Sequence, residues 1–100
     1  MKEDHKQYLT KLFETADDHI RKIEKGIGNK KDFARITTSL KHTATQIYNV
    51  LIYHVDKKVE KEIEKITERI LRLLKDFKKI DNSFLVRELK KEFDNFKKRI

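Results

Sequence analysis

Residues 59–80 read VEKEIEKITERILRLLKDFKKI, and their apolar positions decide the fold. The apolar side chains alternate at spacings of four and three over three heptads, at Val59, Ile63, Ile66, Ile70, Leu73, Phe77 and Ile80. This alternation is typical of a helix that packs along one seam against other helices. The pattern therefore predicts a helix over residues 57–79 with a single buried stripe.

The segment before this helix, residues 36–55, is almost free of charge. Lys41 is its only formally charged residue, although Asp, Glu, Lys and Arg make up 42% of the chain. The apolar spacing predicts a helix over residues 32–54, capped by Asp32, with a buried stripe at Phe33, Ile36, Leu40, Ile47 and Leu51. Because a surface helix normally keeps a charged face, we expect this helix to be covered on most sides.

Two further helices are predicted at the ends of the chain, over residues 3–25 and 83–99. Gly26 follows the first of them, where a glycine ends a helix well. Around the stripe of the second helix we expect core positions from the other three, at Leu12, Ile20, Ile66, Ile70, Leu89 and Phe93. Four helices of similar length predict an all-α fold, an antiparallel four-helix bundle in one domain over residues 1–100.

The connection at residues 54–58 leaves an alternative open. Asp56 can cap a new helix, but no Gly or Pro stops the preceding one. Without a turn here, one central helix of about 45 residues would extend about 65–70 Å between two flanking helices. Such a helix could not bury its stripe within one chain and would have to dimerise.

Composition excludes several classes of protein. The chain has no Pro, two Gly and no Cys, which disfavours turn-rich β folds and rules out disulfides and thiolate sites. Its first residues, MKEDHKQY, lack the apolar core of a signal peptide. Residues 36–55 are too polar to cross a membrane. We therefore expect a soluble, cytoplasmic protein with no membrane partner.

The uncharged side of the second predicted helix is the first candidate site. Its polar residues recur at helical spacing, and with a nearby tyrosine they form a candidate interface of Thr38, His42, Thr45, Gln46, Asn49 and Tyr53. Such a set can be a partly buried polar seam inside the bundle. It can also be a contact surface for a protein partner or a second copy, or a surface for a small ligand or nucleic acid.

The second candidate site is a basic stripe on the third predicted helix. Six cations fall within an arc of about 120°, facing away from the apolar seam, and are candidate nucleic-acid contacts: Lys61, Lys65, Arg69, Arg72, Lys75 and Lys79. The net charge of +8 suits an acidic partner such as nucleic acid. However, Glu68–Arg72 and Arg72–Asp76 are spaced for ion pairs along the helix, which favours a solvated, self-paired face.

Residues 32–51 loosely resemble a bacterial helix-turn-helix. The similar parts are the Ala34-Arg35 pair and the segment Thr43-Ala44-Thr45-Gln46, which stands where that family has the start of its recognition helix. The resemblance implies DNA binding and a turn at Thr37, Thr38 and Ser39. The family usually has an apolar residue, a glycine and a second apolar residue in this turn, and the polar residues here depart from that pattern.

No residue pattern indicates catalysis, a metal or a cofactor. The histidines, His5, His19, His42 and His54, form no H-x-x-x-H pair, and no acidic residue stands three positions before any of them. The sequence therefore predicts a non-enzymatic interaction or assembly module that self-associates or binds a protein partner through the second helix. The alternative is a basic accessory protein that binds nucleic acid through the third helix or a degenerate helix-turn-helix.

Overall fold

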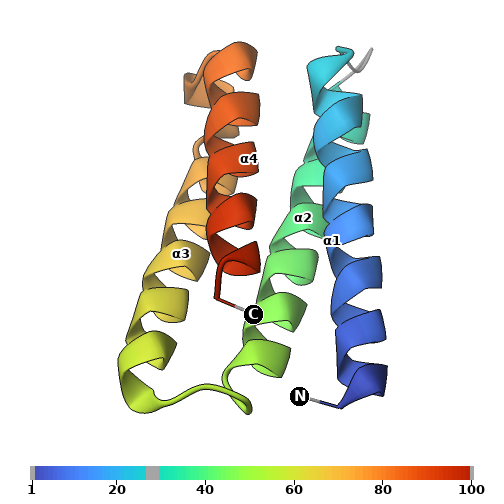
Figure 1. Cartoon of the computed structure of the whole chain (residues 1–100). Coiled ribbons are helices and arrows are strands. Elements are labelled where there is room, and N and C mark those ends of the chain that lie inside the picture. Colours follow the sequence, from blue (N-terminus) through green and yellow to red (C-terminus); the bar gives the residue numbers. More distant parts are fainter. Residues whose placement is uncertain (1, 27–29, 100) are drawn as a thin grey trace.

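The computed structural model describes residues 2–26 and 30–99, which form four α-helices and one short 3-10 turn. The elements are α1 Glu3–Glu24, α2 Lys30–Leu51, α3 Lys57–Lys75, η1 Phe77–Lys79 and α4 Asn82–Lys97. Consecutive helices contact each other, and α4 contacts α1, so the four helices close into a ring. They run side by side in alternating directions (Figure 1). The predicted antiparallel four-helix bundle is confirmed.

All four helices contribute to a single cluster of buried apolar side chains. Most of the predicted core positions are buried, namely Leu12, Ile20, Leu40, Ile47, Leu51, Ile66, Ile70, Leu89 and Phe93. Phe33 and Ile36 are only partly buried and pack against the edge of this cluster. Phe33 stacks on Phe77 with ring centroids 4.9 Å apart, so this pair covers one end of the contact between α2 and the segment after α3.

The alternative of one long central helix is wrong. The helix α2 ends at Leu51, and α3 begins at Lys57. Asp56 adopts an extended backbone conformation, and its carboxylate accepts a hydrogen bond from the Val59 backbone N–H at 3.0 Å. This N-cap satisfies one of the donors that a new helix leaves free, which stabilises a fresh start at this position. The reversal lets the stripes of α2 and α3 face each other within one chain.

Three predicted helix boundaries need correction. The helix predicted over residues 32–54 begins at Lys30 and ends at Leu51, so Asp32 lies within its first turn and not at the predicted N-cap position. The helix predicted to reach residue 79 ends at Lys75, because η1 tightens the chain before the turn into α4. The helix predicted over residues 83–99 spans Asn82–Lys97.

The end of α1 agrees within one residue with the prediction of a helix over residues 3–25. The helix stops at Glu24, and Gly26 has a φ of 78°, in the left-handed region that side chains disfavour. The Gly26 N–H donates to the Ile23 carbonyl at 3.1 Å, which satisfies one of the last carbonyls of the helix.

Within the described residues, no helix has both the length and the apolar content that a membrane span requires.

Candidate interaction surfaces

The six candidate interface residues share one exposed face of α2. Thr38, His42, Thr45, Gln46 and Asn49 are all exposed within the helix, and Tyr53, just beyond its end, keeps 82% of its surface exposed. We call these six residues the α2 outer face. A polar seam inside the bundle is therefore excluded for them, and the expectation of a helix covered on most sides is wrong within this chain.

Helical geometry explains why this face turns outward. The side chains of Leu40, Ala44, Ile47 and Leu51 are completely buried and mark the inward direction of α2. At 100° per residue, Thr45 lies about 100° from Ala44 around the helix axis. The neighbouring helices α1 and α3 cover the two flanks of α2 and leave this side open. The apolar stripe thus fixes which polar residues water reaches.

The threonines of this face have already used their hydroxyl donors. Thr38 Oγ1 donates to the Ala34 carbonyl and Thr45 Oγ1 to the Lys41 carbonyl, each at 2.9 Å. A hydroxyl whose proton is bonded within its own helix loses less when water is removed than a hydroxyl without a partner. The α2 outer face can therefore be covered by another surface at a lower desolvation cost than its polar composition suggests.

The basic stripe of α3 is also exposed, and it is less neutralised than the sequence predicts. All six side chains are exposed, but Lys79 lies in η1, beyond the end of α3 at Lys75. Only Arg69 forms an ion pair, with Glu92 of α4, and among the described residues the other five have no carboxylate within 4.0 Å. The predicted pairs of Arg72 with Glu68 and with Asp76 do not form. A self-paired face is therefore wrong for this stripe.

Arg69 differs from the other five cations because its ion pair connects α3 to α4. Its Nε lies 2.7 Å from Glu92 Oε2, and Asn95 Nδ2 donates to Glu92 Oε1 at 2.9 Å. Glu92 is buried, with 7% of its surface exposed. Glu92 is not among the residues predicted from the sequence, although it follows Leu89 by three positions on the apolar stripe of α4, a spacing that places it at the edge of the core.

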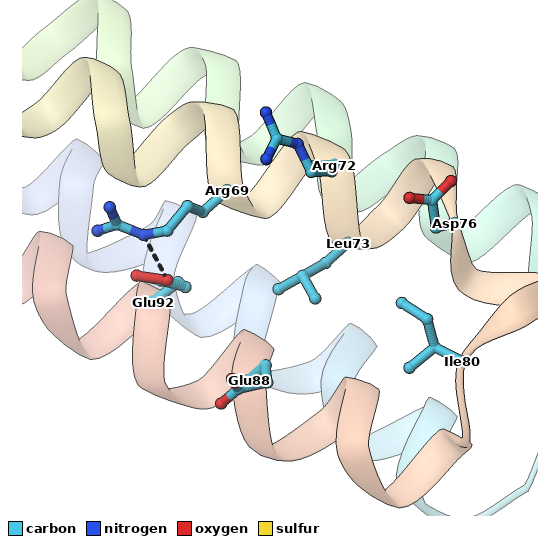
Figure 2. A pocket seen from close by; sticks show the side chains of 7 residues that line it. All are labelled: Arg69, Arg72, Leu73, Asp76, Ile80, Glu88 and Glu92. Atoms are coloured by element: carbon cyan, nitrogen blue, oxygen red, sulfur yellow. Dashed lines mark hydrogen bonds and ion pairs between the residues drawn. The ribbon is translucent and has the colours of Figure 1, made fainter.

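A shallow groove lies beside this ion pair, between α3 and α4 (Figure 2). Its volume is about 260 Å³, and its walls are Arg69, Arg72, Leu73, Asp76, Ile80, Glu88 and Glu92. Ligand sites usually have about 300–1,000 Å³ and bury most of the ligand. Figure 2 shows the ion pair at one end of the groove and Ile80 at the other. The groove is small and carries charges of both signs, so it offers no defined chemistry.

The histidines occupy three different settings. His5 of α1 and His54 of the α2–α3 connection lie together, with ring centroids 4.8 Å apart, and His42 belongs to the α2 outer face. The Nδ1 atom of His19 is buried without a hydrogen-bond partner. Burial, and next the charge of Lys22, lower the pKa of His19 below its usual value. Among residues 2–26 and 30–99, no three His, Cys, Asp or Glu residues gather as a metal site would require.

The helix-turn-helix resemblance fails at its turn. Thr37, Thr38 and Ser39 lie inside α2, which is continuous from Lys30 to Leu51. A recognition helix cannot be presented without the change of direction before it.

Comparison with protein-family models, with curated proteins and with solved structures finds no match to this chain. The candidate sites are therefore the α2 outer face and the basic stripe of α3.

Proposed function

We propose that this chain is a non-enzymatic interaction module that binds another protein surface through the α2 outer face. The observation that carries the proposal is an exposed helix face without formal charge in a chain in which 42% of residues are charged. Charged residues are depleted at the centre of protein interfaces, where they would lose water without a partner. Tyr53, 82% exposed at one end of the face, is a residue type that interfaces favour.

The structure of the face suits a rigid docking surface. Five of its residues lie on one continuous helix that is anchored by completely buried side chains, so binding would require no ordering of the backbone. The bonded hydroxyls of Thr38 and Thr45 reduce the cost of removing water from the face. The side chains of His42, Gln46 and Asn49 supply donors and acceptors that give a partner its orientation.

Site-specific photo-crosslinking tests this proposal. A photoreactive amino acid replaces Thr45 on the α2 outer face or, as a matched control, Thr10 on α1. Thr10 is also exposed, and its hydroxyl makes the same hydrogen bond to the carbonyl four residues earlier, at 2.9 Å. Irradiation of the cells that produce the chain should give a discrete protein adduct from position 45 and not from position 10. Equal or absent adducts from both positions would refute the proposal.

A second candidate function, binding of a nucleic-acid backbone, is favoured by a separate observation. Five exposed cations of the α3 stripe have no ion-pair partner among the described residues, namely Lys61, Lys65, Arg72, Lys75 and Lys79. Unpaired cations are free to replace the counterions of a phosphate chain. The stripe has no aromatic residue among its six members, so this binding would be to phosphates and independent of base sequence.

A further inference from the structure

We propose that the partner of the α2 outer face is a second copy of this chain, packed across a two-fold axis with the two α2 helices antiparallel. This inference rests on the proposed function, because it names the partner of the same face. Two properties of the face support it: the absence of charge at its centre, and the order of its residues along the helix.

The absence of charge is what a two-fold contact requires. Close to a two-fold axis each residue lies near its own copy, so a charged residue there would face an identical charge. Each copy also carries a net charge of +8, so two copies repel each other over most of their surfaces. A contact with a different protein has no such restriction, and it normally uses opposite charges for orientation and speed of binding. An uncharged face in a strongly charged chain therefore fits a second copy better than a foreign partner.

The order of the residues is symmetric about the midpoint between Thr45 and Gln46. Counting outward from that point, the six positions have the same spacing on both sides, in the order Thr38, His42, Thr45, Gln46, Asn49 and Tyr53. A two-fold axis through the midpoint of two antiparallel helices brings position n of one copy opposite position 91 minus n of the other. Every residue of the face then meets another member of the face.

These pairs are chemically complementary. His42 of one copy lies opposite Asn49 of the other, and an imidazole and an amide can exchange a hydrogen bond in either direction. Thr45 lies opposite Gln46, whose amide N–H can donate to the hydroxyl oxygen that remains available as an acceptor. At the periphery the methyl group of Thr38 meets the exposed ring of Tyr53. Each pair occurs twice, so the contact repeats its few polar interactions.

The size of the face sets the expected strength. From Thr38 to Tyr53 the face extends about 22 Å at a rise of about 1.5 Å per residue, and a helix is about 10 Å wide. The product, about 220 Å², is well below the roughly 800 Å² that each partner buries in a standard stable interface. The edges of α1 and α3 add to the contact, but the dimer should be weak, with a dissociation constant in the micromolar range or above.

Charge substitutions at Thr45 give the decisive experiment. Sedimentation equilibrium of the purified chain from about 10 μM to about 1 mM should reveal a monomer–dimer equilibrium. Thr45→Lys and Thr45→Glu should each weaken the dimer by about tenfold or more, because position 45 stands beside the two-fold axis and the two copies of the new charge therefore lie close together. An equimolar mixture of the two variants should restore association, since opposite charges then meet at the axis. Thr10→Lys and Thr10→Glu are the matched controls and should leave the equilibrium unchanged.

Three outcomes would overturn the second-copy inference. The first is a wild-type chain that stays monomeric over the whole concentration range. The second is a mixture of the Lys and Glu variants that associates no better than either alone. The third is a crosslinked adduct from position 45 whose mass differs from that of two chains, a result that would still support the proposed function. Circular dichroism confirms that the variants fold, and Gln46→Lys with Gln46→Glu repeats the test at the paired position.

Discussion

The ion pair between Arg69 and Glu92 leads to a stability prediction in which two partners of one interaction behave unequally. Their side chains are 2.7 Å apart, but 49% of the Arg69 side chain is exposed and only 9% of the Glu92 side chain. Arg69→Met leaves a buried carboxylate without its cation. Glu92→Met leaves a cation that water can still solvate, and it places an apolar group of similar length at the edge of the core. The arginine variant should therefore be the less stable of the two.

The magnitude follows from the burial of the two groups. Removing one partner of a fully buried ion pair costs about 3–5 kcal/mol. Here Asn95 still donates to the carboxylate, and the site opens to water on the arginine side, so we expect about 1–2 kcal/mol for Arg69→Met. For Glu92→Met the removal of a buried charge offsets the lost interaction, and we expect a change within about 0.5 kcal/mol.

Urea denaturation followed by far-ultraviolet circular dichroism measures these differences, provided that all variants unfold with the same denaturant dependence. The double variant provides the internal control. Because it no longer contains the buried carboxylate, it should be more stable than Arg69→Met alone. The reasoning is refuted if Glu92→Met destabilises the bundle as much as Arg69→Met does, or if the double variant is the least stable of the three.

Three further predictions concern other parts of the molecule. Gly26→Ala should destabilise the bundle by about 1 kcal/mol because φ at this position is 78°, whereas Gly26→Asn should destabilise it less. The midpoints of thermal unfolding of the two variants and the wild-type chain measure this difference. The pKa of His19 is lowered, so the unfolded chain binds the proton first and stability should fall as the pH drops below about 6.5. The pKa of His54 is also lowered, by desolvation and then by His5, and it acts in the same direction. His19→Leu should therefore reduce this pH dependence without abolishing it, and it should not destabilise the bundle at neutral pH. An unchanged pH dependence of stability in this variant would contradict the role given to His19. If the five unpaired cations of the basic stripe contact duplex DNA, the logarithm of the binding constant should fall with the logarithm of the salt concentration, with a slope of up to about −4.5. Lys65→Gln should reduce the magnitude of that slope by about 1, whereas the control Lys11→Gln on α1 should leave it unchanged. Fluorescence anisotropy measures both slopes, and no binding at about 50 mM salt excludes this function.

The fold could be predicted because its determinants are periodic. The seam of residues 59–80 predicts the helix, and Ile63, Ile66 and Ile70 are buried as their spacing indicates. Near the end of the helix Leu74 is completely buried, whereas Leu73 of the predicted seam is only partly buried. The boundaries were harder to predict because capping is not a property of one residue type. Asp32 and Asp56 both stand before apolar residues, yet Asp56 occupies an N-cap position whereas Asp32 lies within the first turn of its helix. The difference depends on where tertiary contacts turn the chain, which neither aspartate encodes.

The candidate surfaces lie on helix faces, except for Tyr53 and Lys79, but their surroundings could not be predicted. Thr43 and Thr45 are two positions apart, and one is buried whereas the other is exposed, because they lie 200° apart around the axis. The sequence gives that angle. It does not give the width of the arc that α1 and α3 cover, and so it could not distinguish an internal seam from an open face. The ion pair that removes Arg69 from the basic stripe depends on α4, which is distant in the sequence.

The composition of the α2 outer face also bears on the stability of the helix itself. On α1 the chain covers solvent-exposed positions with residues such as Lys6, Lys11 and Glu14, which favour helices. On α2 the equivalent positions hold Thr, His and Asn, each less favourable in a helix than Lys or Glu by a few tenths of a kcal/mol. Over the face this difference amounts to about 1 kcal/mol, and exposure to water alone does not explain it. A partner that covers the face does explain it, because contacts made there offset the lower helix propensity. A row of lysines and glutamates would instead lose its hydration when the partner binds.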